Sequence, residues 1–581
     1  MAIHTFNALK IDPKYNPAVL DTATWDESYL AHELSDFHAD SLQGGDISKI
    51  AKALPKGIQM IPESHESVGG RDWALCESND GQNFFISLGA RDDSVLGSPF
   101  FTKKLRENWF LCAYPAKDSV IDRFVTFIQP DKSPKPLGAI PRLGIGNRHT
   151  TTIWPGIWKA MEKKHFAANA IQNSVRELHQ LQTLLVGEPA RVNHLYSFGK
   201  MKEGHTGSTF EGLWTAGVLS ALKNPGKNTY GADADHLQVK RGTEGVSRTK
   251  KLIDSARYFT FYTMDVSDIL EYTALTSLSF ADIRSQVNKS IPSASLRTEL
   301  VDYHKRNRFS IQRGSSPQEL NEEMIIRFMC KYWGALDALT DLDFYLKNLK
   351  QGRGYDLELS IDETPSDFSV FKAITTNEEL QFLINEIHRR GIAVTHIAPN
   401  FGVEKGVNYR APGGLPSLEH RVSQQIQIAA RNGLMLDCHS GDDLSRETRR
   451  VFGRATKGNI HFKVSPYLQV LYAKTLEKIN PHDFRIWWED TLAYAKESAE
   501  QGSSTAIESL ALLSSSDWKL PSADHLFFRE YNFATVGKRD NTGNFRFRPM
   551  FYSQGAEFQS ELDQAVADFL CECAQDLFEV Q

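Results

Sequence analysis

The amino-acid sequence predicts an α/β protein built on a (β/α)8 barrel of the TIM type, with an additional N-terminal α+β region. Two observations lead to this prediction. After about residue 135, short β-rich runs alternate with longer stretches of helical periodicity, as a parallel sheet with crossover helices requires. Polar residues also follow several of these runs, and the carboxyl ends of barrel strands are where such residues form a site.

The first 135 residues are expected to form a separate accessory region. They combine short alternating runs with turns, and strands are expected at residues 82–88 and 109–114. The segment Pro130-Asp-Lys-Ser-Pro-Lys-Pro is typical of a linker. The predicted division is therefore residues 1–135 for the accessory region and residues 136–581 for the barrel.

Strand and helix signals alternate through the predicted barrel. Two helices are expected, each ended by a glycine: residues 377–390, before Gly391, and residues 418–432, before Gly433. Barrel strands are expected at residues 258–264, 356–361, 392–398, 433–438 and 459–464. The polar residues that follow these strands are Asp265, Asp362, Glu363, Asn400 and His439. A barrel would bring these distant positions together at one mouth.

The composition argues against several classes of protein. A chain of 581 residues with 41% hydrophobic content can bury a large core. A net charge of −6 gives no general attraction to nucleic acid or to an anionic membrane. No run approaches the roughly 18 apolar residues of a transmembrane helix, and no signal-peptide pattern is present. Six cysteines without a disulfide or zinc-knuckle spacing favour a reducing compartment, so a cytoplasmic protein is expected.

The most informative segment is Tyr230-Gly-Ala-Asp-Ala-Asp-His-Leu, in which the adjacent residues Asp235 and His236 come just after a glycine-containing turn. Two later histidines, His439 and His461, lie on apolar strand-like runs. Three imidazoles that converge from separate strands can hold a divalent metal with an open coordination position, and the neighbouring carboxylate can move a proton. The alternative is structural: a turn Asp, a capping His and two interior histidines. Adjacent side chains on an extended segment share a direction only where the backbone bends.

Other charged residues are candidates for contact with a substrate. Glu363 could transfer a second proton or cap the next helix. Lys463 is expected on the same strand face as His461, where it could bind an anionic group or form a structural ion pair. Arg148 ends the segment Gly144-Ile-Gly-Asn-Arg, which could form a nest of backbone donors for a carboxylate or phosphate. Neither a dinucleotide fingerprint nor a P-loop is present, so no nucleotide cofactor is expected.

Several motifs together resemble the tagaturonate epimerase family, in order and spacing, over about residues 140–540. They are Tyr230-Gly-Ala-Asp-Ala-Asp-His-Leu, Phe261-Tyr-Thr-Met-Asp-Val-Ser-Asp, Ser360-Ile-Asp-Glu-Thr, the stretch from Ala398-Pro-Asn-Phe to Glu404-Lys-Gly, His439-Ser-Gly-Asp and His461-Phe-Lys-Val. The likeness also reaches back to Arg148 and Gln172-Asn-Ser-Val-Arg-Glu-Leu. The resemblance implies a divalent-metal enzyme of hexuronate catabolism that interconverts D-tagaturonate and D-fructuronate. It implies Asp235 as proton acceptor, Glu363 as proton donor, and His236, His439 and His461 as metal ligands. The chain departs from the family pattern at Asn147 and Asn400, where the resemblance leads us to expect charged residues, and these two differences bear on the identity of the substrate.

Simple enolisation cannot perform this reaction, because the two ketouronates differ at C4, one carbon beyond the position that the C2 ketone acidifies. Breaking and re-forming the C3–C4 bond, a retro-aldol step followed by an aldol step, would invert C4. The layout of an Asp-His pair and later metal histidines is also similar to that of class II sugar aldolases. The substrate carboxylate would need a cation, for which Arg148, Lys405 and Lys463 are candidates. The loop at residues 399–410 is the candidate lid over the site.

Two alternative functions stay open at this point. A metal-dependent aldolase or aldose-ketose isomerase acting on a related sugar acid would use the same residues. A non-catalytic carbohydrate-binding protein, in which the histidines are structural, belongs to a different class. Three imidazoles suit zinc, manganese, iron, cobalt or nickel with little discrimination, so the metal is not identified. A homo-oligomer is compatible with the sequence.

Overall fold

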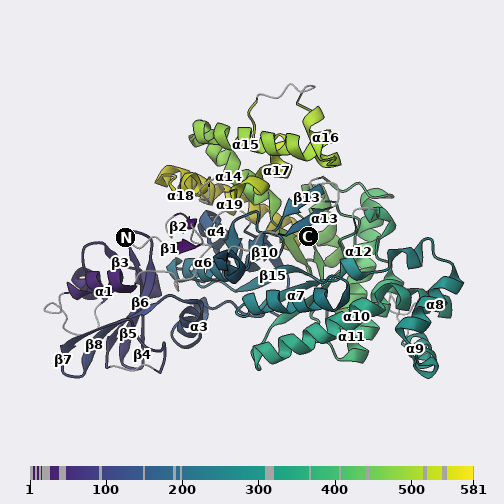
Figure 1. Cartoon of the computed structure of the whole chain (residues 1–581), viewed down its shortest axis with the longest axis horizontal. Helices are drawn as coiled ribbons and strands as arrows, with labels where there is room; N and C mark the ends of the chain where they lie inside the picture. The colour runs from purple at the N-terminus through teal and green to yellow at the C-terminus, as the bar shows by residue number, and fades with distance from the viewer. Residues whose placement is uncertain are drawn as a thin grey trace.

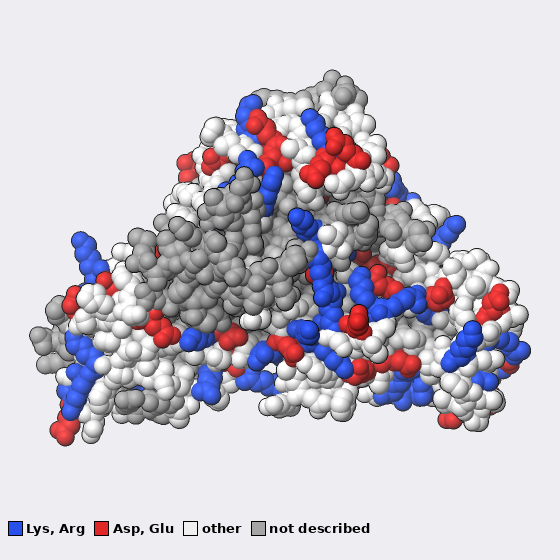
Figure 2. All heavy atoms as spheres, viewed as in Figure 1, with Lys and Arg blue, Asp and Glu red and all other residues white. Residues whose placement is uncertain are grey.

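A computed structural model describes residues 4–6, 9–11, 15, 27–37, 47–90, 94–147, 151–186, 191–195, 199–307, 320–365, 368–404, 407–439, 441, 444–513, 520–538 and 546–579. Figure 1 shows a barrel at the centre, an N-terminal sheet on one side of it and a group of C-terminal helices on another. On the face drawn in Figure 2, basic and acidic side chains are interspersed. None of the described helices is long and apolar enough to cross a membrane.

The central element is a closed barrel of eight parallel strands, which confirms the predicted fold class. The strands follow one another in chain order, and the last pairs with the first. They are β9 (Arg142–Gly146), β10 (Ala167–Ser174), β15 (Tyr230–Gln238), β16 (Phe261–Asp265), β17 (Asp356–Ser360), β18 (His396–Ala398), β19 (Met435–Cys438) and β20 (His461–Val464). The five strands expected from the sequence are β16 to β20.

Two segments outside the five expected strands also belong to the barrel. Gly144 and Gly146, expected in a donor nest, belong to β9, and Asp235 and His236 lie within β15. No larger residue fits at Gly144, because a Cβ there would lie 2.5 Å from Gln172 Oε1 and 2.8 Å from His461 Nε2. The glycines therefore make room for side chains inside the barrel.

Helices surround the barrel, as the βα pattern predicts. The expected helix at 377–390 is α11, which begins with a capping box of Thr376 and Glu379 and ends at Gly391 with φ 66°. The expected helix at 418–432 begins earlier, as α12. The ring consists of α4 (Trp154–Lys164), α6 (Phe210–Lys223), α7 (Gly242–Ser255), α10 (Glu322–Lys350), α11 (Asn377–Arg390), α12 (Gly414–Arg431), α13 (Arg446–Thr456) and α19 (Ala556–Phe578). The C-terminal helix α19 contacts both α13 and α4 and so closes the ring.

The N-terminal region contains an antiparallel sheet. Its order is β3-β5-β6-β8-β7, with β4 paired to β5, and the strands expected at 82–88 and 109–114 are β6 and β8. The bounds are β3 (Ile58–Met60), β4 (Glu66–Val68), β5 (Arg71–Ser78), β6 (Asn83–Gly89), β7 (Phe101–Arg106) and β8 (Trp109–Pro115). One face packs on α1 (Glu27–Ser35) and α2 (Ile47–Ala53), and the other shares a hydrophobic core with α3 (Asp118–Phe127) and the barrel. The division at residue 135, between α3 and β9, stays a prediction.

Two further groups of helices lie outside the barrel ring and the N-terminal sheet. Helices α8 (Phe280–Ser290) and α9 (Ala294–Arg306) lie between β16 and α10 in the sequence. The C-terminal group follows β20 and lies at the top of Figure 1. It consists of α14 (Pro466–Ile479), α15 (Pro481–Glu500), α16 (Ser504–Ala511), α17 (Leu526–Val536) and α18 (Arg548–Tyr552).

Candidate active site

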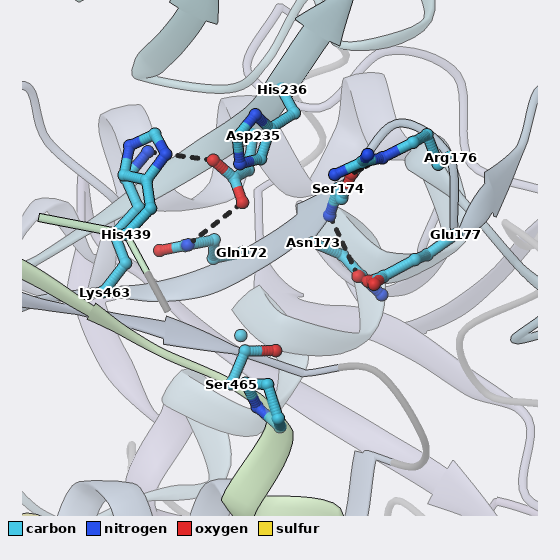
Figure 3. Close-up of a pocket in the computed structure, with 12 residues that line it drawn as sticks. Gln172, Asn173, Ser174, Arg176, Glu177, Asp235, His236, His439, Lys463 and Ser465 are labelled. Carbon is cyan, nitrogen blue, oxygen red and sulfur yellow. Dashed lines mark hydrogen bonds and ion pairs between the residues drawn. The ribbon is translucent and has the colours of Figure 1, made fainter. Parts of the chain in front are cut away.

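A pocket lies at the carboxyl ends of the barrel strands, the end at which the sequence predicts a site (Figure 3). Strands β9, β10, β15 and β20 and the segment after β19 contribute to it. Its lining residues are Gly146, Gln172, Asn173, Ser174, Arg176, Glu177, Asp235, His236, His439, Lys463, Ser465 and Pro466. The pocket is therefore built mainly from polar side chains.

A bulge in β15 directs two adjacent side chains into this pocket. Asp235 pairs with Ser174 of β10, but the register with β16 shifts between Ala234 and Leu237. His236 has φ 50°, a left-handed conformation that is unfavourable for a residue with a Cβ. The bend that the sequence analysis required is thus present, and Asp235 and His236 line the same pocket.

Lys463 is the electrostatic centre of the barrel interior. Its Nζ lies 2.8 Å from Asp235, 2.9 Å from Glu358 and 3.3 Å from Asp233, and it also donates to Thr263. Burial alone would raise the pKa of Asp235, but Lys463, His236 and His439 outweigh it and hold that pKa well below its ordinary value. Asp235 is consequently ionised, which is the form that accepts a proton.

Burial and the neighbouring charges act differently on Asp233. Although Lys463 opposes them, burial and the charge of Asp235 raise the pKa of Asp233 to about 7. The interior therefore holds one carboxyl that titrates near neutral pH beside one that stays ionised. Lys463 forms the structural ion pairs that the sequence analysis gave as its alternative, and its predicted contact with a substrate stays untested.

His236, His439 and Asp362 form a group that fits a divalent metal. One ligand atom of each lies within 4.8 Å of the others. His236 Nδ1 lies 3.3 Å from Asp265, and His439 Nε2 lies 2.8 Å from Glu358, so each ring has a carboxylate partner behind it, as metal-binding histidines usually do. The other nitrogen of His439, Nδ1, is buried without a hydrogen-bond partner, although Asp362 Oδ2 is 3.1 Å away.

The charge around His439 also favours a cation. Burial would lower the pKa of this imidazole, but Asp362 and Glu358 raise the pKa to about 10. A positive charge is stabilised at this point, and a metal ion would supply one in place of the proton. The donor set of two imidazoles and a carboxylate is compatible with zinc and with several other divalent transition metals.

His461 lies in a different group, deeper in the barrel. Its Nδ1 is 2.7 Å from Asp437, and its ring packs against His396 with centroids 5.6 Å apart. His396, Asp437 and His461 are mutually close, whereas His461 does not join the group of His236 and His439 among the described residues. The reason is its position at the first residue of β20, two residues before Lys463, while His439 follows the last residue of β19. His461 does face the same side as Lys463, as strand alternation predicts.

Glu363 follows β17 and lies at the edge of the site. Its Oε1 accepts a hydrogen bond of 3.1 Å from Arg176 and is 3.9 Å from His236 Nε2. The predicted proton donor is thus near the predicted metal site. Two of the predicted substrate contacts, Arg148 and Lys405, lie outside the described residues.

Sequence reasoning did not assign several residues that the structure brings to the site. Asp362 was noted only for its place after a strand, and Arg176, Glu358 and Asp265 received no role. A signal for Glu358 was available in Asp356-Leu-Glu-Leu-Ser, where acidic residues alternate with leucines on a strand that is buried throughout. Charges with a period of two on a buried strand indicate a polar barrel interior.

Comparison with known proteins gives a consistent group of relatives. A family model described as "UxaE: tagaturonate epimerase" matches residues 201–505. The tagaturonate/fructuronate epimerase of Thermotoga maritima is 24% identical over 452 residues, which are 76% of this chain and 80% of the relative.

Solved structures of one protein share the fold. The structure of fructuronate-tagaturonate epimerase UxaE from Cohnella laeviribosi complexed with one glycerol has a TM-score of 0.65 and 19% identity to this chain. The match covers 90% of this chain and 96% of the other. The native structure of the same protein gives a TM-score of 0.64.

Proposed function

Because this chain belongs to the tagaturonate epimerase family, we propose that it is an isomerase that interconverts D-tagaturonate and D-fructuronate at C4. The observation that carries the proposal is the bulge of β15, by which an ionised Asp235 and His236 line one pocket next to His439. An ionised carboxylate beside a potential metal site supports a proton transfer close to a polarised ketone.

We assign the first proton transfer to Asp235. It removes the proton of the C4 hydroxyl, the oxygen electrons form an aldehyde at C4, and the C3–C4 bond breaks. The electrons of that bond pass to C3 and give an enediolate over C2 and C3. The aldehyde fragment turns, the bond re-forms on its other face, and Glu363 donates a proton to the new C4 oxygen. In the reverse direction the two carboxyl groups exchange these tasks.

We propose His236, His439 and Asp362 as the residues that hold a divalent metal. When bound, such a cation would polarise the C2 ketone and stabilise the negative charge of the cleaved state. Their proximity and the carboxylate partners behind both imidazoles support this assignment. Ligation by His461, which the family resemblance implies, stays a prediction, since that residue belongs to the deeper group. The cytoplasmic location and the homo-oligomer also stay proposals that rest on the sequence.

The test is NMR of purified, metal-loaded protein incubated with D-tagaturonate, beside a chelated sample. The proposal predicts D-fructuronate in the metal-loaded sample and little or none after chelation. Release of three-carbon fragments would instead identify an aldolase, and an aldose product would identify an aldose-ketose isomerase. Unchanged D-tagaturonate in both samples, with binding retained, would favour the carbohydrate-binding alternative.

A further inference from the structure

We propose that Arg176 binds the carboxylate of the substrate and so makes the site selective for a sugar acid over a neutral sugar. This inference rests on the proposed function, because the carboxylate is what distinguishes a ketohexuronate from a ketohexose. Arg176 follows β10 and lines the pocket, with a side chain that is 9% exposed.

The pocket offers two permanent cations among its described lining residues, Lys463 and Arg176. Lys463 has one ammonium group with three N–H bonds, and four oxygens already surround it, those of Asp235, Glu358, Asp233 and Thr263. A substrate carboxylate there would have to displace a buried carboxylate of the protein. Arg176 is the cation that is left for the substrate.

The guanidinium of Arg176 has donors to spare. Nη2 donates to Glu363 at 3.1 Å, and Nε makes a long contact of 3.4 Å with Ser174 Oγ. Nη1 has no hydrogen-bond partner among the described residues, and this nitrogen is not fully buried, so a ligand can reach it. Since a guanidinium presents its donors in a rigid planar fork, Arg176 can donate to the Glu363 carboxyl group on one side and to the carboxylate of the substrate on the other.

The backbone fixes Arg176 next to the reacting centre. Val175 N donates to Asp235 O at 2.9 Å, which joins the segment after β10 to the bulge of β15. Gly204 N donates to the carbonyl of Arg176 at 3.0 Å, so the segment is bonded on both sides. The backbone at Arg176 is therefore tied to the strand that carries Asp235, and the contact with Glu363 orients the guanidinium.

The order of groups across the pocket matches the order of groups along the substrate. In Figure 3, His439 lies on one side, Asp235 and His236 lie in the middle, and Arg176 points inward from the other side. A ketohexuronate has its ketone at C2, the hydroxyl that loses a proton at C4 and its carboxylate at C6. The ketone would lie near His439, C4 near Asp235 and the carboxylate near Arg176.

The experiment compares D-tagaturonate with D-tagatose, which has CH2OH in place of the carboxylate. Calorimetric titration of the metal-loaded full chain measures both dissociation constants for the wild type, Arg176→Met and Arg176→Lys. Arg248→Met is the matched control, because Arg248 is similarly buried and pairs with Glu203 but does not line the pocket. Metal content and thermal unfolding are recorded for every protein.

Arg176→Met is expected to weaken D-tagaturonate binding by about 100-fold and to leave D-tagatose binding nearly unchanged, since the lost partner is a desolvated charge. Arg176→Lys keeps the charge without the fork and is expected to weaken D-tagaturonate binding by about tenfold; it decides the matter if Arg176→Met does not fold. Equal weakening of both sugars, or an unchanged preference for the acid, would overturn the inference. A wild type that prefers the acid through Arg176 but forms no D-fructuronate would refute the proposed function alone.

Discussion

A single residue pair, Asp235 and His236, brings the proposed proton acceptor next to the proposed metal ligands. The bulge at these residues is unfavourable for the backbone, as the φ of 50° at His236 shows. It is held in place by pairing with β10 on one side and by ion pairing of Asp235 with Lys463 at 2.8 Å on the other. The strain thus has a function, because an unbent strand would turn one of the two side chains away from the pocket.

Asp235→Asn tests the proton transfer directly. The amide keeps the size of the side chain but cannot accept a proton, so the rate of epimerisation is expected to fall by about a thousandfold. Initial rates from NMR measure the effect, and bound metal is expected to stay near the wild-type content. Asp341→Asn serves as the control, since Asp341 pairs with Lys250 and its side chain is 50% exposed. A rate within tenfold of the wild type would rule out Asp235 as the base.

Among the secondary-structure elements, α11 is held to its neighbours by a buried charge network. Glu386 accepts hydrogen bonds from Arg389 and Arg390 of the same helix, and it lies 3.1 Å from His304 of α9. Burial would raise the pKa of Glu386, but Arg389, His304 and Arg390 outweigh it and lower the pKa to about 2. The network therefore stabilises the fold only while Glu386 is ionised.

The pH dependence of the stability that Glu386 contributes follows from the direction of its pKa shift. A carboxyl whose folded pKa lies below its ordinary value of 4.5 adds stability above that value and loses it as the pH falls toward about 2. Glu386→Gln is expected to lower the free energy of unfolding by about 3 kcal/mol near pH 7 and by about half as much near pH 3. Denaturant titrations at both pH values measure the difference.

Glu419→Gln is the control for that experiment, because Glu419 makes an exposed ion pair with Arg454 on the surface. It is expected to change the stability little at either pH. The assignment of the network would be incorrect if Glu386→Gln had the same effect at both pH values.

At the scale of the whole molecule, the N-terminal region and the barrel share one hydrophobic core. Trp73, Leu75 and Phe85 of the sheet belong to the same buried cluster as the barrel strands. The connecting segment is bonded to the barrel as well, since Lys132 Nζ donates to Gly226 O at 2.6 Å and the backbone carbonyl of Lys132 accepts from Tyr230 Oη at 2.6 Å. The two regions that the sequence separates at residue 135 are thus physically continuous.

A chain of residues 136–581 is expected to be less stable than the full chain, because the buried apolar face that packs against the sheet would meet water. Thermal unfolding and gel filtration are expected to show a lower unfolding temperature and aggregation. An unfolding temperature equal to that of the full chain would show that the sheet is dispensable for the fold.

Sequence patterns predicted the features that repeat along the chain and missed those that depend on closure of the barrel. The strands β16 to β20 and the helix α11 follow from hydrophobic runs, helical periodicity and a glycine end. In β9 and β15, small and charged residues replace the apolar run, because their inner faces meet other side chains inside the barrel, so these strands were not among those expected from hydrophobic runs. Asp235, His236 and His439 could be chosen by residue type and strand position. The depth of His461 could not, since it depends on the tilt and stagger of neighbouring strands.

The most direct test of the central claim is NMR in D2O of metal-loaded protein converting D-tagaturonate. A retro-aldol and aldol sequence breaks no carbon–hydrogen bond, so the account predicts D-fructuronate without deuterium on carbon. Deuterium at C3 of the product would show that a carbon-bound proton is exchanged and would contradict the C3–C4 cleavage that Asp235 is proposed to start. Absence of D-fructuronate would contradict the epimerase function itself.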